Sequence, residues 1–167
     1  MATRSTIALE FADGTVGQVY CHWDGYLSNN GKILFENYSN PFILRDLIDL
    51  GDISSLGPNI GKAHPFSQFE IEKDNPDFDK LIALHELAKN SGWTTFYGRD
   101  RGEADVEARY FKDFADYSDN VQFEEYNYIL RTDGRWYVSS YNTDGYITLA
   151  EAFVKEQVAT VWNIYKK

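Results

Sequence analysis

Two turns that each contain an Asp-Gly pair constrain this chain more than any other feature of its sequence. Each pair lies between segments in which apolar and polar side chains alternate, and such a pair readily adopts the positive φ angles of a tight hairpin turn. The segments are residues 4–11 and 16–23 around Asp13-Gly14, and residues 121–131 and 135–141 around Asp133-Gly134. The sequence therefore predicts two β-hairpins, each with one side of its strands in a core.

Between and after the hairpins, apolar residues recur at intervals of three and four, the spacing of one face of an α-helix. The predicted helices cover residues 31–38, 41–50, 76–90, 103–117 and a last segment that begins with a capping box of Thr148 and Glu151. Short strands are predicted at residues 66–71 and 93–97, with a loop at residues 51–61. We expect one α+β domain over residues 1–167, with packed helices on an antiparallel sheet built from the two hairpins. Residues from about 142 to 167 form a C-terminal helical extension of that domain.

The last predicted helix carries an apolar stripe. Its members are Val154, Val158, Val161, Trp162 and Tyr165. Such a stripe packs against the sheet of its own chain or against a partner helix. The sequence is therefore compatible with a homodimer that pairs through this helix.

The chain has a net charge of −10 and an isoelectric point of about 4.7. An acidic protein repels nucleic acid and anionic membranes, so direct binding of nucleic acid is disfavoured and a basic partner is favoured. A single cysteine excludes an internal disulfide and a cysteine zinc cage. No segment approaches the roughly 20 apolar residues of a membrane span. We expect a cytoplasmic protein that needs no cofactor and has no complete metal-ligand signature.

The segment VYCHWDGY, residues 19–26, gathers the only cysteine with a histidine, a tryptophan and a carboxylate. In an extended strand, His22 and Asp24 share a face while Cys21 points the opposite way. A carboxylate beside an imidazole fixes its tautomer and raises its basicity, which suits a general base, a metal ligand or a binding pocket. The alternative is structural: Trp23 packs inward, Asp24 caps the turn and His22 bonds to backbone.

A second polar cluster, YGRDRGE, covers residues 97–103. Arg99 and Arg101 are two positions apart beside a glycine-bounded turn, so they are able to grip a phosphate or carboxylate through forked hydrogen bonds. A self-contained turn, in which these arginines pair with Asp100 and Glu103, is the alternative. Aromatic side chains available to stack on a ring of the ligand are Trp23, Tyr26 and Tyr97.

Five motifs together resemble a group of small proteins encoded by phages and prophages. They are TRSTIAL near the start, YCHWDGY, LGDISSLG, GRDRGE and DGRWYV. The resemblance covers most of the chain up to about residue 138, and the motifs are specific as a set. It implies a phage setting and the host cytoplasm, with little information on mechanism. Where this chain has Gly98 the group often has His, and this departure counts against an enzyme if that His is catalytic in the group.

The first functional hypothesis is a phage-encoded accessory binding protein that interferes with a host process or defence system. It would block a host protein or sequester a small anionic, nucleotide-like ligand. The ligand-binding residues would be His22, Trp23, Asp24, Tyr26, Tyr97, Arg99, Asp100, Arg101 and Glu103. The acidic face offered to a host protein would be Glu103, Asp105, Glu107 and Asp113.

The second hypothesis is a phosphoester hydrolase or nuclease. His22 would be its general base, with Asp24 as the orienting group or as a metal ligand. Arg99 and Arg101 would then clamp the anionic substrate.

Overall fold

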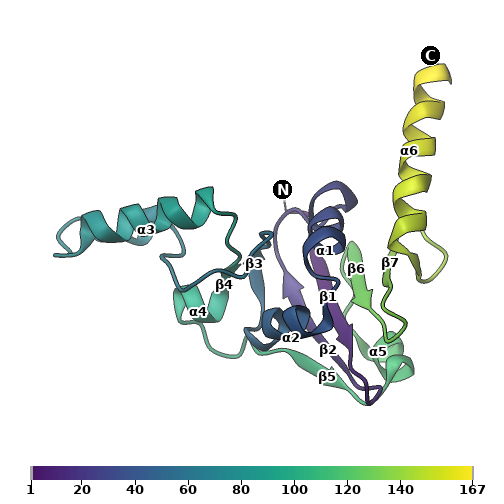
Figure 1. The fold of residues 1–167 in the computed structure, drawn as a ribbon, viewed down its shortest axis with the longest axis horizontal. Helices are drawn as coiled ribbons and strands as arrows, with labels where there is room; N and C mark the ends of the chain where they lie inside the picture. Colours follow the sequence, from purple (N-terminus) through teal and green to yellow (C-terminus); the bar gives the residue numbers. More distant parts are fainter. Residues whose placement is uncertain (1, 167) are drawn as a thin grey trace.

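The computed structural model describes residues 2–166, with side chains described as far as Val161, and has a mixed β-sheet at its centre (Figure 1). Within these residues eight strands form the sheet, in the order β4-β3-β2-β1-β6-β7-β8, with β5 paired to β2. The strands are β1 Ser5–Glu10, β2 Val16–Cys21, β3 Ile53–Ser55, β4 Thr95–Phe96, β5 Arg109–Phe111, β6 Tyr126–Leu130, β7 Trp136–Ser140 and β8 Ile147–Thr148. The predicted α+β class is confirmed.

Both predicted hairpins are present, but the sheet is mixed and not antiparallel. β1 pairs antiparallel with β2, and β6 pairs antiparallel with β7. The hairpins join through their first strands, because β1 and β6 lie side by side and pair in parallel. β3 also pairs in parallel with β2. The prediction of an antiparallel sheet is therefore wrong. The alternating residues and the turns specify which strands pair within a hairpin, but they do not specify how one hairpin pairs with the other.

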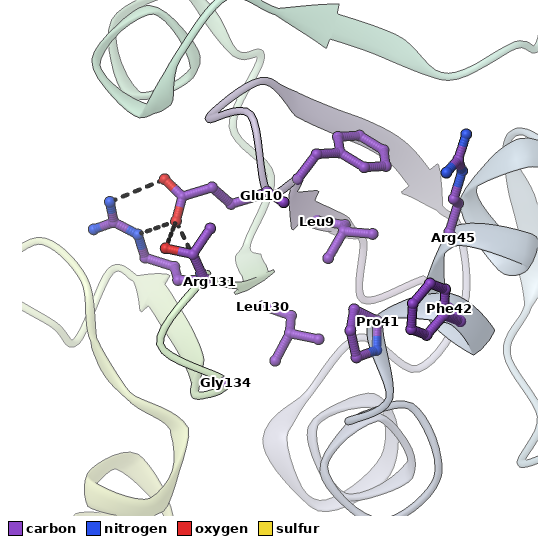
Figure 2. A pocket seen from close by; sticks show the side chains of 11 residues that line it. Leu9, Glu10, Pro41, Phe42, Arg45, Leu130, Arg131 and Gly134 are labelled. Atoms are coloured by element: carbon purple, nitrogen blue, oxygen red, sulfur yellow. Dashed lines mark hydrogen bonds and ion pairs between the residues drawn. The ribbon is translucent and has the colours of Figure 1, made fainter.

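Helices cover both faces of the central sheet. On one face, α1 (Lys32–Asn37), α2 (Pro41–Asp49) and the start of α6 (Leu149–Lys166) pack on the larger core cluster, which includes Ile7 and Leu9 of β1. On the other face, α5 (Phe114–Asn120) packs Tyr117 against Ala8 of β1. Successive residues of β1 therefore enter opposite cores, as a pleated strand requires. A pocket opens where the tips of both hairpins meet the start of α2 (Figure 2).

Three local predictions are wrong. Residues 51–61, predicted as a loop, contain β3; residues 66–71, predicted as a strand, contain a 3-10 turn at Gln68–Glu70. Residues 103–117, predicted as one helix, form β5 and the start of α5. The helical pattern is interrupted because Gly102 and Asp105 have φ angles of 74° and 61°. Asp113 then begins α5, since its carboxylate accepts a hydrogen bond from the Asp116 N–H at 2.7 Å.

The helix α3, Phe78–Asn90, projects from the edge of the sheet beyond β3 and β4 (Figure 1). Ala88 is its buried residue, and its other apolar side chains are at least partly accessible. The short helix α4, Tyr97–Arg101, follows β4 at the base of this projection. No helix in the described part of the chain is long and apolar enough to cross a lipid bilayer.

The helix α6 begins as predicted, because the Glu151 N–H donates to Thr148 Oγ1 at 3.2 Å. Its first turn docks on the sheet, and then the helix projects away (Figure 1). Val154, Val158 and Val161 are each more than half exposed, so this part of the stripe does not pack on the sheet. The side chains of Trp162 and Tyr165 lie outside the described residues.

Candidate binding site

The first predicted cluster lies where β2 ends. His22 Nδ1 is 2.7 Å from the Tyr20 hydroxyl oxygen, so its hydrogen-bond partner is a tyrosine and not Asp24. Asp24 leaves the extended conformation, with φ 54°, and its carbonyl accepts hydrogen bonds from the backbone N–H of Asn30 and the side chain of Asn29. The predicted pairing of His22 with Asp24 assumes a strand that continues through residue 24, and the turn removes that condition. Trp23 and Tyr26 remain partly exposed at this turn.

Cys21 points into the core and is completely buried. Its thiol lies 3.4 Å from the Asn30 side-chain nitrogen and 3.7 Å from the Trp23 carbonyl. Burial raises the pKa of the Cys21 thiol to about 11. The side chain is therefore a core group, turned away from the face that carries Tyr20 and His22.

We expect the Cys21 thiol to be unreactive in the folded protein. Dithionitrobenzoate at pH 8 should label the thiol rapidly in denaturant and at least a hundredfold more slowly without it, because the reactive thiolate is scarce and enclosed. Equal labelling rates in the two states would contradict the burial.

The same thiol makes stability depend on alkaline pH. Since its pKa rises on folding from 9.0 to about 11, its contribution to stability is complete below pH 9 and is lost as the pH rises through about 11. The free energy of unfolding of the wild type should therefore fall more steeply over this range than that of Cys21→Ala.

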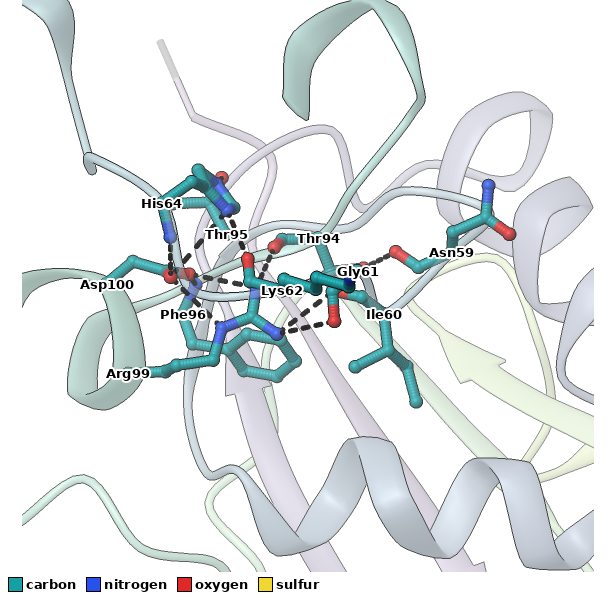
Figure 3. Close-up of polar contacts among 10 residues, drawn as sticks. All are labelled: Asn59, Ile60, Gly61, Lys62, His64, Thr94, Thr95, Phe96, Arg99 and Asp100. Atoms are coloured by element: carbon teal, nitrogen blue, oxygen red, sulfur yellow. Dashed lines mark hydrogen bonds and ion pairs between the residues drawn. The ribbon is translucent and has the colours of Figure 1, made fainter. Parts of the chain in front are cut away.

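The guanidinium of Arg99, from the second predicted cluster, forms its hydrogen bonds with groups of its own chain (Figure 3). Its Nε and Nη2 donate to the two oxygens of Asp100 at 3.0 and 3.2 Å, and Nη2 also donates to the Thr94 carbonyl at 2.9 Å. Its Nη1 donates to the carbonyls of Ile60 and Gly61 at 3.1 and 3.3 Å. Since a guanidinium has five N–H donors, these bonds leave none for an external anion.

The Asp100 carboxylate is fully buried and also accepts hydrogen bonds from the backbone N–H groups of Phe96, at 2.8 Å, and His64, at 3.1 Å (Figure 3). His64 is itself buried. Its Nδ1 lies 2.7 Å from the Lys62 carbonyl oxygen and its Nε2 lies 3.0 Å from Thr95 Oγ1. The network ties the loop before α3 to β4 and α4. No local sequence pattern marks His64, because its partners are distant in sequence.

Arg101 lies at the accessible side of α4. Its guanidinium binds Glu70 at 2.8 Å, approaches Glu103 at 3.7 Å and lies over the ring of Phe66, 4.0 Å from the ring centre. It borders a hollow of about 570 Å³ between α4, the loop at residues 63–75 and α3, which we name the arm hollow. Leu81 and Leu84 of α3 form part of its apolar wall. Both arginines of the cluster are thus paired with carboxylates.

A junction in the sheet brings together residues that neither predicted cluster contains. The first half of β2 pairs with β5, and its last residue pairs with β3. At the change of partner, the Tyr20 N–H donates to Asp52 Oδ1 at 2.9 Å, and Arg109 binds both Asp52 oxygens at 3.0 Å. The Asp52 carboxylate therefore completes the hydrogen bonding of β2.

This junction borders a polar hollow of about 460 Å³, whose wall also includes Gln18 and Glu124. Burial raises the pKa of Tyr20 to about 12, so its hydroxyl keeps its proton at neutral pH and acts as a hydrogen-bond donor or acceptor. No motif links Asp52 to Arg109, because the two residues are 57 positions apart.

The short strand β3 lies between the two predicted clusters. The Trp23 N–H donates to the Ser54 carbonyl, and the Tyr97 N–H donates to the Asp52 carbonyl. Among residues 2–166, no hydrogen bond or ion pair joins a side chain of one cluster to a side chain of the other, and no group of three His, Cys, Asp or Glu side chains is placed to hold a metal ion. The two clusters are neighbours, but their side chains do not contact each other through hydrogen bonds or ion pairs.

Comparisons with protein-family models, with curated proteins and with solved structures yield no match to this chain.

Proposed function

We propose that this chain is a phage-encoded accessory binding protein that interferes with a host process by docking on a basic, partly apolar surface of a host protein. The observation that carries the proposal is the arm hollow with its apolar wall and carboxylate rim. Phe69 precedes Glu70 of the rim and is 89% exposed, which is unusual for a large aromatic side chain. Exposed apolar groups beside a concave surface are typical of protein interfaces.

The charges around the hollow favour a basic partner. Glu70 and Glu72 line it, and Glu103 is linked to Glu70 through Arg101. The segment after α4 adds further exposed carboxylates. This segment is held against the sheet by a hydrogen bond from the Asp52 N–H to the Val106 carbonyl at 2.8 Å. Complementary charge speeds encounter and selects the partner.

Asp113 does not belong to the docking surface in this proposal. Its carboxylate is used as the cap of α5. The surface consists of the arm hollow and the exposed acidic residues Glu103, Asp105 and Glu107.

The other modes of action receive less support from the geometry. Sequestration of an anion at Arg99 would require breaking bonds that its guanidinium makes inside the protein, since all five donors are engaged, and Arg101 already binds two carboxylates. A hydrolase that uses His22 as a base would have Tyr20, and not Asp24, as its orienting group. Docking on the arm hollow requires none of these bonds to break.

The proposal is tested with a triple variant, Glu72→Lys, Glu103→Lys and Glu107→Lys. A host protein captured by the wild type is identified, purified and titrated calorimetrically against both proteins at two salt concentrations. We expect binding to the variant to be at least about tenfold weaker, and wild-type binding to weaken with salt, because rim charges act through screened attraction.

A matched control is Glu36→Lys, Asp46→Lys and Asp49→Lys, which changes the net charge equally at exposed positions on α1 and α2. It should bind within about twofold of the wild type. An equal loss of affinity in both triple variants would show that only the net charge matters, and it would overturn the proposal. Failure to capture any host protein would also overturn it, as would a copurified anion, seen by native mass spectrometry, that is lost in Arg101→Gln.

A further inference from the structure

We infer that the chain has a second, separate site, which binds a small apolar molecule carrying a carboxylate. The pocket at the hairpin tips has a volume of about 290 Å³ and lies between β1, β6 and the start of α2 (Figure 2). Its inner wall is formed by Leu9 and Leu130, which are 2% and 1% exposed. Its outer wall is formed by Pro41 and Phe42. None of these residues belongs to the arm hollow, so the inference is independent of the proposed function.

The size and lining of this pocket select a single ring or a short branched chain. Small-molecule sites usually occupy roughly 300–1,000 Å³, so this pocket lies at the lower limit. Phe42 is 77% exposed although it is one of the largest apolar side chains on α2. A ligand ring placed against Phe42 would cover apolar surface that water now contacts, and that burial favours binding.

The charges at the mouth select an anion. Arg131 is already paired with Glu10, at 3.2 and 3.1 Å from its two oxygens (Figure 2). Arg45 lines the pocket on another side, and no carboxylate of the described residues lies within ion-pair distance of it. Its guanidinium carbon is 5.8 Å from the centre of the Phe11 ring. The three charged groups that line the pocket therefore leave one net positive charge, although the whole chain carries −10.

These two features together define the ligand class. The apolar walls accept a ring, and the guanidinium of Arg45 is suited to forked hydrogen bonds with a carboxylate at the mouth. A cationic ligand would be repelled, and a neutral one would leave Arg45 without its partner. We therefore assign the pocket to aromatic or branched aliphatic monocarboxylates.

The test uses three probes of one shape: 3-phenylpropionate, its amide and the corresponding amine. Each is titrated into the ¹⁵N-labelled full chain, and the backbone amide resonances are followed by NMR. We expect the carboxylate to bind saturably with a dissociation constant on the order of 0.1–1 mM, as is usual for a ligand of about eleven heavy atoms. The largest shifts should fall on residues 9–12, 41–45 and 130–134. The amide should bind about tenfold more weakly, and the amine more weakly still.

Arg45→Gln should lower affinity for the carboxylate about tenfold, while affinity for the amide stays within about twofold, since only the charged contact is removed. Phe42→Ala should weaken both. Arg4→Gln, which removes an exposed arginine outside the pocket, is the matched control and should bind as the wild type does. The inference is overturned if carboxylate and amide bind equally, if the shifts fall elsewhere, or if no probe saturates below about 10 mM.

Discussion

Replacing Asp100 with Ala is expected to lower the free energy of unfolding by about 3–5 kcal/mol, because it leaves a buried cation without its counter-charge. Asp100 is fully buried and binds Arg99, whose side chain is 13% exposed. The same carboxylate accepts the backbone N–H groups of Phe96 and His64. The substitution therefore removes the acceptor of two guanidinium N–H groups and of two backbone amides at once.

Urea denaturation of the purified variant measures this effect. Glu107→Ala is the control, since its side chain is exposed and should change stability by no more than about 0.5 kcal/mol. Asp100→Asn keeps the shape and one acceptor, so an intermediate loss is expected. A loss below about 1 kcal/mol for Asp100→Ala would show that the network does not hold the α3 projection to the sheet.

Replacing Leu47 with Ala should cost about 2–5 kcal/mol, the usual range for a buried leucine that leaves a cavity. Leu47, on the buried side of α2, is completely buried in the larger core cluster. Alanine has the higher helix propensity, so the loss must come from packing.

Phe42→Ala on the same helix is the matched comparison. It removes a larger apolar side chain, yet Phe42 is 77% exposed and the loss should stay below about 1 kcal/mol. The two variants are compared by thermal and urea unfolding. Similar losses of stability in the two variants would contradict the difference in burial between Leu47 and Phe42.

The hairpins are predictable from sequence because their signals are local. Asp-Gly turns and alternating strands act over a few residues, and the capping residue Thr148 acts on the next turn of helix. The parallel contact between β1 and β6 depends on long-range packing, for which the sequence carries no short-range signal. The segment 103–117 shows the opposite error: its apolar residues have helical spacing, but the backbone is left-handed at Gly102, just before the segment, and at Asp105 within it.

Only some residues of the candidate site can be predicted from the sequence, and their roles cannot. Arg99 and Asp100 are adjacent in sequence, and the structure places their ion pair inside the protein, where it binds the loop carbonyls of Ile60 and Gly61. Burial decides whether an arginine serves a ligand or its own chain, and burial depends on the whole fold. His64 and Asp52 have partners supplied by distant segments, so no motif identifies them.

During synthesis, β1 cannot form its parallel contact until β6 has been made. Thr6 of β1 hydrogen-bonds to Asn127 of β6, a residue 121 positions later. At elongation rates of roughly 5–20 residues per second, β1 therefore stays on the ribosome for roughly 6–24 seconds without its β6 partner. An open strand edge is a template for pairing with other chains. Chaperone binding and aggregation should therefore concentrate in nascent or truncated chains that end before β6, and both should fall once residue 130 has emerged.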